Sequence, residues 1–241
     1  MLPAAKSCTK QKEGKCLRIL MDGSDADVFR NLNDYLPLDG VTTNPSILAK
    51  GKGTAEEQVL QIANLLDKQQ TLHVQVVSTK YEQMVEEAKR IIEAVSRNVF
   101  IKIPVSPDGL KAVRSLRGES INTTVTGVYT TMQAVMAAKA GAAYVAPYIN
   151  RIDLTHSDSE IVINQIVQAY QTYGFSTKVL AASFKNTRQV IGVMEAGVEE
   201  VTLSTDILKN LIHHKETEMS IEAFTEDFTS RFENRNEMFL K

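Results

Sequence analysis

The sequence has no tryptophan and only two cysteines, Cys8 and Cys16, among its 241 residues. Both cysteines precede the first predicted strand and no cluster of histidines lies near them. Neither a disulfide framework nor a zinc site is therefore expected. This use of cysteine is typical of proteins from a reducing compartment, so we expect a cytoplasmic protein.

The chain also lacks an excess of one charge and lacks long apolar runs. Its formal net charge is −2, and its lysines and arginines are spread along the whole sequence. No basic patch is present that would bind a nucleic acid or a membrane surface, so neither partner is expected. No segment reaches the roughly 18 to 20 apolar residues of a membrane-spanning helix. Residues 1–17 lack the apolar core of a signal peptide, and we expect them to form a loosely ordered extension.

In the remaining chain, short β-branched runs alternate with amphipathic helical stretches. The predicted strands are residues 18–23, 40–43, 72–78, 99–105, 120–128, 143–148, 178–183 and 200–204. The predicted helices are residues 26–35, 55–66, 81–95, 109–116, 130–140, 158–173, 187–195 and 205–213. This alternation predicts a single α/β domain over residues 18–241, a (β/α)8 barrel. A doubly wound sheet would alternate in the same way, but no G-x-G-x-x-G motif or phosphate-binding loop follows any strand.

A further helix is predicted at about residues 221–239, after the barrel. Its phenylalanines recur at helical spacing: Phe224, Phe228, Phe232 and Phe239. Packing against the barrel wall or against a neighbouring subunit would account for this apolar stripe.

One lysine, Lys102, interrupts an otherwise apolar predicted strand. The apolar residues at positions 99, 101, 103 and 105 share one face, so Lys102 points to the other. If that face lines a barrel interior, loss of hydration lowers the pKa of the ammonium group, and a neutral amine can attack a carbonyl. The alternative is a lysine on an edge strand whose ammonium group reaches water.

The same alternation places further polar side chains on the interior faces, towards the carboxyl ends of the strands. They are Asp22, Thr42, Asn44, Gln75, Thr124, Thr126 and Tyr148. Barrel interiors are usually filled by Val, Ile and Leu, and barrel enzymes keep their sites at this end. Because buried polar groups are costly unless they are used, the group predicts a catalytic site. Taken singly, Asp22 could cap a helix, Thr42 or Asn44 could belong to a turn, and Tyr148 could be a satisfied interior hydroxyl.

Four motifs in order resemble the transaldolase family. They are GVTTNPS at residues 40–46, IKIPV at 101–105, APYINR at 146–151 and AASFK at 181–185. The similarity runs from about Leu17 to the C-terminus and is greatest to the short branch that includes fructose-6-phosphate aldolase. The resemblance implies chemistry on sugar phosphates without a metal or cofactor. It also implies a homo-oligomer, because short-branch relatives form rings, often of ten subunits, in which the C-terminal helix crosses to a neighbour.

The resemblance implies a role for each matching position. Lys102 corresponds to the lysine that forms a Schiff base with the ketose, and Asp22 to the aspartate that takes the proton from the C4 oxygen. Thr42 and Asn44 correspond to residues that hold the lysine and the sugar hydroxyls. The anion-binding positions are matched by Arg151, Ser183 and Lys185, where Lys185 replaces a frequent arginine.

Two positions separate aldolase from transaldolase within this resemblance. Gln75 stands where longer transaldolases carry a glutamate, and glutamine cannot carry a proton at neutral pH. Tyr148 stands where they carry phenylalanine, and with Gln75 and Thr126 it can hold a water that protonates the carbanion. The two residues favour cleavage of fructose 6-phosphate over transfer of a dihydroxyacetone unit. Transaldolase activity is the alternative, and a non-catalytic sugar-phosphate binder is a more distant one. His73, close to the pocket, replaces a frequent aromatic residue and is expected to be a passive wall residue.

Overall fold

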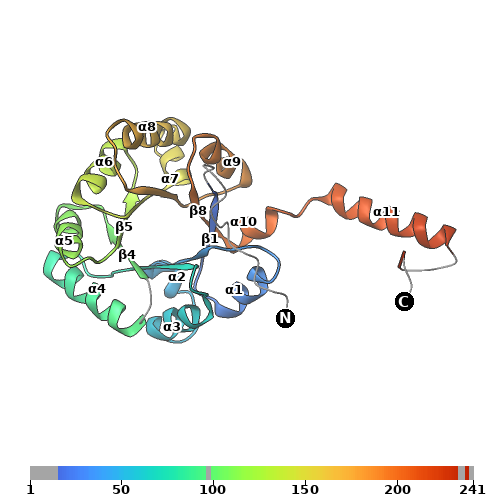
Figure 1. Cartoon of the computed structure of the whole chain (residues 1–241), viewed down its shortest axis with the longest axis horizontal. Helices are drawn as coiled ribbons and strands as arrows, with labels where there is room; N and C mark the ends of the chain where they lie inside the picture. The colour runs from blue at the N-terminus through green and yellow to red at the C-terminus, as the bar shows by residue number, and fades with distance from the viewer. Residues whose placement is uncertain (1–15, 96–98, 233–236, 239–241) are drawn as a thin grey trace.

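Eight parallel strands close into a barrel in sequence order (Figure 1). The computed structural model describes residues 16–95, 99–232 and 237–238. The strands are β1 (Arg18–Asp22), β2 (Gly40–Thr42), β3 (Thr71–Gln75), β4 (Val99–Pro104), β5 (Thr123–Val128), β6 (Tyr144–Pro147), β7 (Lys178–Ala181) and β8 (Glu200–Ser204). The predicted (β/α)8 barrel is confirmed. Nearly all of the predicted N-terminal extension lies outside the described residues.

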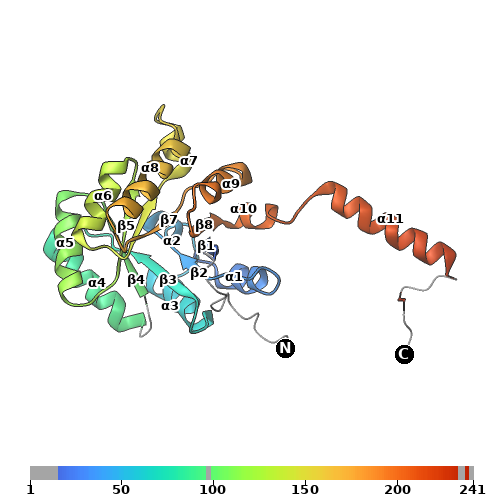
Figure 2. The same ribbon diagram turned by 45° about the horizontal axis from the view of Figure 1, so that its top comes forward.

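Helices surround the barrel in both ribbon views (Figures 1 and 2). They are α1 (Ala26–Asn33), α2 (Pro45–Leu48), α3 (Ala55–Leu65), α4 (Tyr81–Val95), α5 (Pro107–Gly118), α6 (Thr131–Ala140), α7 (Ile149–Asp153), α8 (Ser159–Thr172), α9 (Thr187–Glu195) and α10 (Thr205–Asn210). The short helices α2 and α7 are absent from the prediction because one or two turns are too few to show a periodic pattern. No helix in the described part of the chain is long and apolar enough to span a membrane.

Local sequence signals set many helix ends. At the start of α3, Thr54 and Glu57 form a capping box in which each side chain accepts a hydrogen bond from the other residue's backbone N–H. The helix α6 ends at Gly141, whose φ of 92° lies in the left-handed region that glycine adopts without strain. Thr54 lies in the connection after β2 and Gly141 in the connection before β6, so these signals act at both ends of the barrel.

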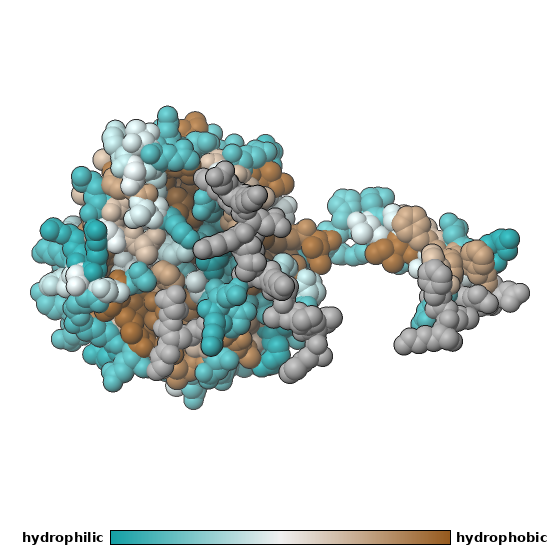
Figure 3. All heavy atoms as spheres, viewed as in Figure 1, coloured by the Kyte–Doolittle hydropathy of each residue, from teal (hydrophilic) through white to brown (hydrophobic). Residues whose placement is uncertain are grey.

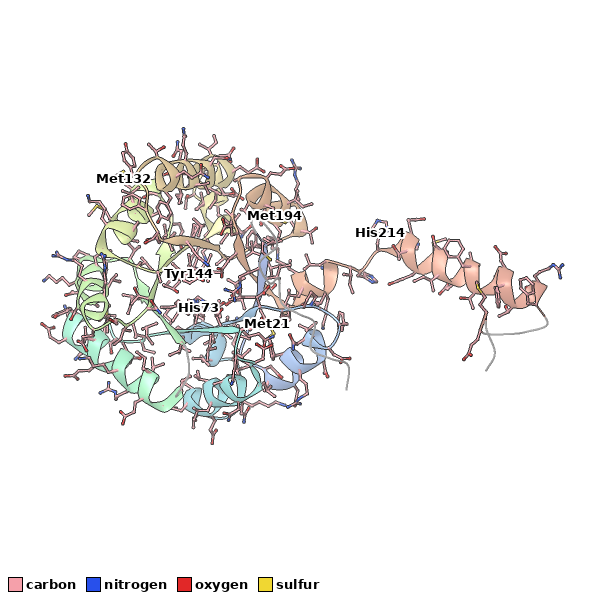
Figure 4. The ribbon with its side chains drawn as sticks, in the orientation of Figure 1. Met21, His73, Met132, Tyr144, Met194 and His214 are labelled. Carbon is pink, nitrogen blue, oxygen red and sulfur yellow. The ribbon has the colours of Figure 1, made fainter. Side chains whose placement is uncertain are left out.

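The barrel interior is bridged by polar pairs at three successive levels. From the amino to the carboxyl ends of the strands, these pairs are Tyr144 with Glu200 (2.9 Å), His73 with Thr124 (2.9 Å) and Thr42 with Thr202 (2.7 Å). The strand register accounts for the levels, because inward side chains of alternate strands meet in layers of four. Figure 4 shows His73 and Tyr144 inside the barrel. The upper level supports the site at the carboxyl ends.

The last helix, α11 (Lys215–Arg231), extends away from the barrel in both ribbon views (Figures 1 and 2). None of its residues is buried, and Phe224 is 71% exposed. Apolar and hydrophilic side chains lie next to one another on this extension (Figure 3). Packing on the barrel wall, one of the two explanations for the phenylalanine stripe, is therefore wrong. The helix begins six residues before the predicted start, and Phe239 lies outside the described residues.

Candidate active site

Lys102 lies in the interior of the barrel, on β4 between β3 and β5. It is only 4% exposed, and its Nζ donates a hydrogen bond to the backbone carbonyl of Thr43 at 2.8 Å. Burial lowers the pKa of the Lys102 ammonium group, and the nearby charge of Asp22 opposes this shift. A closed barrel has no edge strand, so the alternative of an edge lysine is wrong.

Asp22 stands at the carboxyl end of β1 and is paired in register with Thr42 on β2. Its Oδ1 accepts a hydrogen bond from the Thr42 hydroxyl at 2.7 Å. Asp25, not Asp22, caps the following helix, which removes the capping explanation for Asp22. The Asp22 carboxylate is half-buried and close enough to Lys102 to affect its pKa. A carboxylate and a buried amine are thus brought together.

Tyr148 follows β6, and its hydroxyl is 2.8 Å from the hydroxyl of Thr126 on β5. Gly127, with a φ of 71°, lies at a shift of register between these strands. Such a bulge, which glycine permits without a steric penalty, changes how the strand end presents its side chains. Burial raises the pKa of the Tyr148 phenol, although its bond to Thr126 and the charge of Arg151 oppose this. The phenol is consequently neutral and able to donate a proton.

Gln75 ends β3 and pairs in register with Lys102. Its Oε1 is buried, and among the described residues no group donates a hydrogen bond to it. Buried polar atoms nearly always have a partner, so an unpaired acceptor beside the lysine is available to a substrate or a water.

Asn44 lies between β2 and α2 and is half-buried. Its Oδ1 accepts a hydrogen bond from the backbone N–H of Ile47 at 3.1 Å and thereby caps α2. The turn-type role considered for Asn44 is therefore present. The side-chain oxygen is held by this bond, and the amide NH2 supplies two donors for a ligand.

The three residues expected to bind phosphate lie after β6 and β7. Arg151, exposed on α7, places its guanidinium carbon 4.8 Å from the centre of the Tyr148 ring. Ser183 has a φ of 62°, a strained value for a serine, and its carbonyl accepts a hydrogen bond from Asn150 N–H at 2.8 Å. This contact joins the end of β7 to α7. Lys185 is exposed, and no contact in the described structure connects its side chain to the others.

Two participants in this arrangement are missing from the sequence-based prediction. The backbone carbonyl of Thr43 binds the lysine, and a backbone group carries no signal in the residue type. Thr202 on β8 reaches Thr42, and it could have been found because it shares the inward face of its strand with Glu200.

Comparison with known proteins agrees with this geometry. A family model described as transaldolase/fructose-6-phosphate aldolase matches residues 19–240. The chain belongs to this family. A relative from Kosmotoga olearia, named a "probable transaldolase", is 38% identical over 88% of this chain and 96% of its own length. One from Streptococcus pneumoniae, named a "probable fructose-6-phosphate aldolase", is 34% identical over the same shares of the two chains.

Membership of the transaldolase/fructose-6-phosphate aldolase family confirms the predicted family and the prediction of an enzyme. Among solved structures, a flavocytochrome b2 variant with sulfite bound gives a TM-score of 0.58 at 12% identity. The alignment covers 80% of this chain and 57% of the flavocytochrome b2 chain. At such low identity the match shows the barrel fold alone.

Proposed function

We propose that this enzyme is a class I aldolase that cleaves fructose 6-phosphate into dihydroxyacetone and glyceraldehyde 3-phosphate. The observation that carries the proposal is Lys102, a buried lysine whose amine is held by a backbone carbonyl and whose pKa is lowered by burial. The lowered pKa increases the fraction of neutral amine, the form that attacks a ketone. No metal or cofactor enters this chemistry.

The first half of the reaction forms and breaks bonds at Lys102. The neutral Nζ adds to the C2 carbonyl, and loss of water gives a protonated imine. The C3–C4 bond then breaks as its electron pair moves into the imine, which leaves an enamine on the lysine. Asp22 accepts the proton of the C4 hydroxyl, so that glyceraldehyde 3-phosphate leaves as an aldehyde. Thr42 holds Asp22 for this step.

The second half returns a proton to the enamine carbon. The Tyr148 phenol is neutral and bound to Thr126, and the free Oε1 of Gln75 supplies an acceptor for a water between them. A water held in this way passes a proton to the enamine carbon. Asp22 gives up the proton that it took from the C4 hydroxyl, which replaces the one that the water has lost, so both groups return to their starting state. Addition of a water molecule to the resulting imine releases dihydroxyacetone and the free lysine.

The phosphate group of the substrate is proposed to bind near α7. The Arg151 guanidinium lies against the Tyr148 ring, and the Ser183 hydroxyl offers a further donor. A guanidinium with neutral donors suits a phosphate dianion. Lys185 is exposed beside these residues and would contribute its charge rather than a fixed contact.

The reaction is tested by following glyceraldehyde 3-phosphate released from fructose 6-phosphate, with and without erythrose 4-phosphate. Release without the acceptor supports the aldolase. Borohydride reduction with dihydroxyacetone should also add mass to the peptide that carries Lys102. Absence of an adduct at saturating ketone would refute the Schiff base.

Transaldolase activity is the second candidate, because the relative from Kosmotoga olearia carries that name. The two activities share every step up to the enamine and differ in whether a proton or an aldehyde captures it. Release of glyceraldehyde 3-phosphate only with erythrose 4-phosphate, together with formation of sedoheptulose 7-phosphate, would establish the transferase and reject our assignment of Tyr148.

We also infer that the enzyme is a homo-oligomeric ring in which α11 packs on a second copy, and that it works in the cytoplasm. In support of the oligomer, Ile221 and Phe224 on α11 are 58% and 71% exposed in the single chain. Exposed apolar side chains that share one face of a helix are unusual on the surface of a monomer. A ring, such as a decamer, would cover them.

A further inference from the structure

A chain of hydrogen bonds links Thr202 on β8 to Thr42 on β2 and then to Asp22 on β1. The Thr42 hydroxyl donates to Asp22 Oδ1 at 2.7 Å, and Thr42 Oγ1 is also 2.7 Å from Thr202 Oγ1. Thr42 and Thr202 are 0% and 3% exposed, so water does not compete for these hydroxyls. The three side chains come from β1, β2 and β8, three neighbouring strands of the closed barrel.

The direction of each hydrogen bond follows from counting hydrogens. An ionised carboxylate only accepts, and a threonine hydroxyl has a single hydrogen to donate. Since Thr42 gives its hydrogen to Asp22, the hydrogen between the two threonines must come from Thr202. The order of donation is therefore Thr202 to Thr42 to Asp22.

This order has a consequence for the carboxylate. Without Thr202, the Thr42 hydroxyl could rotate and bind elsewhere, whereas a donor at its oxygen fixes the direction of its hydrogen. The fixed hydrogen holds Oδ1 of Asp22. Within the described chain, Oδ2 has no hydrogen-bond partner and remains able to accept a proton from a substrate hydroxyl.

We propose that Thr202 is a positioning residue for the reaction, acting through Thr42 on the Asp22 carboxylate. The inference rests on the proposed function, because it needs Asp22 as the proton acceptor in C3–C4 cleavage. Thr202 is 3% exposed, and its hydroxyl contacts Thr42, through which it acts on the carboxylate. Its effect is confined to the cleavage step, and formation of the imine at Lys102 does not depend on it.

The test compares Thr202→Val, which keeps the shape and removes the hydroxyl, with Thr202→Ser, which keeps the hydroxyl. In the valine variant we expect kcat to fall about 3- to 10-fold, the effect of one lost neutral hydrogen bond, with KM within twofold of the original. The serine variant should recover the rate. Thr123→Val is the matched control, because Thr123 is buried on the outward face of β5 and should leave kcat within twofold.

Two further measurements separate positioning from packing. The rate at which borohydride and dihydroxyacetone label Lys102 should stay within twofold in Thr202→Val. When Thr202→Val is added to Thr42→Val, kcat should fall by less than twofold further. The Thr42 hydroxyl, which links Thr202 to Asp22, is already absent from that variant. If Thr202→Val does not fold, Thr202→Ala against Thr202→Ser makes the same comparison.

The proposal is overturned if the valine variant keeps its full kcat. It is equally overturned if serine fails to restore the rate, if labelling of Lys102 falls in parallel with kcat, or if the effects of the two threonines add. Failure of the proposed function would look different, because the unmodified enzyme itself would then show no labelling of Lys102.

Discussion

Replacing His73 by phenylalanine should make the stability of the protein less sensitive to acid. His73 is 0% exposed, stacks on Phe100 with ring centres 4.7 Å apart, and bonds through Nδ1 to Thr124. Burial and the positive charges of Lys102 and Arg18 lower its pKa well below the ordinary value of 6.5. The folded protein therefore keeps His73 neutral at a pH where the unfolded chain protonates it.

The sign follows from proton linkage. Below pH 6.5 the unfolded state binds one more proton than the folded state, so the free energy of unfolding decreases as the pH falls. The contribution is complete above pH 6.5 and is lost towards the lower pKa of the folded state. Between pH 7.5 and pH 5.5 the loss is about 1.4 kcal/mol from this residue alone. His73→Phe should lack this loss.

The assay is urea unfolding of both proteins at pH 7.5 and pH 5.5, at one protein concentration because assembly contributes to stability. Loss of the bond to Thr124 changes the stability of the variant equally at both pH values and cancels in the difference. Thr124→Val is the control, since it removes the same bond but keeps the histidine, and it should retain the full sensitivity to acid. If His73→Phe loses as much stability as the original protein between the two pH values, His73 is not neutral in the folded state.

Three further outcomes are expected. Lys102→Met should fold and give no borohydride adduct with dihydroxyacetone, because no other amine is proposed to form the imine; mass spectrometry of the peptide decides this. Tyr148→Phe should reduce cleavage of fructose 6-phosphate by about 100-fold, the scale of a lost general acid, and reduce transfer to erythrose 4-phosphate less. Equal losses in the two assays would contradict the proton relay. A chain that ends at Leu211 should sediment as a smaller particle than the full chain if α11 joins subunits, and an unchanged mass would show that it does not.

Alternation along the strands is enough to identify most of the interior side chains from the sequence. A side chain such as Lys102 must face the interior if its neighbours face the helices, and this parity depends only on the pleat of the strand. The same rule could have identified Thr202, but the prediction did not extend to the inward face of the eighth strand. The contact of Lys102 with the Thr43 carbonyl could not be predicted, because every residue has a carbonyl and only the fold decides which one lies near.

The ends of the last helix show another limit of pattern reading. The phenylalanine stripe marks the apolar face and predicts a helix from about residue 221. The first turns of α11 are instead stabilised by the His214 cap and by Glu216 and Glu218, whose negative charges favour a helix start. Polar residues of this kind give no periodic signal, so the hydrophobic pattern located the helix but placed its start too late.

The polar pairs inside the barrel lie beside apolar side chains such as Leu20, Phe100 and Leu180. Each pair makes one hydrogen bond across its level, Tyr144 with Glu200 and His73 with Thr124. Glu200 Oε1 also accepts a hydrogen bond from Lys178 at 3.2 Å, so the lowest level extends beyond its pair. Removing one partner leaves a buried polar atom and costs about 1–3 kcal/mol, whereas replacing both by apolar groups of the same shape can be nearly neutral. By this reasoning the level of His73 and Thr124 could be apolar with little loss of stability, whereas Glu200 also pairs with Arg18 and Lys178 and could not be replaced so simply. The level of Thr42 and Thr202 differs, because its hydrogen bond continues to Asp22, and there an apolar pair would keep the fold but leave the carboxylate unsupported.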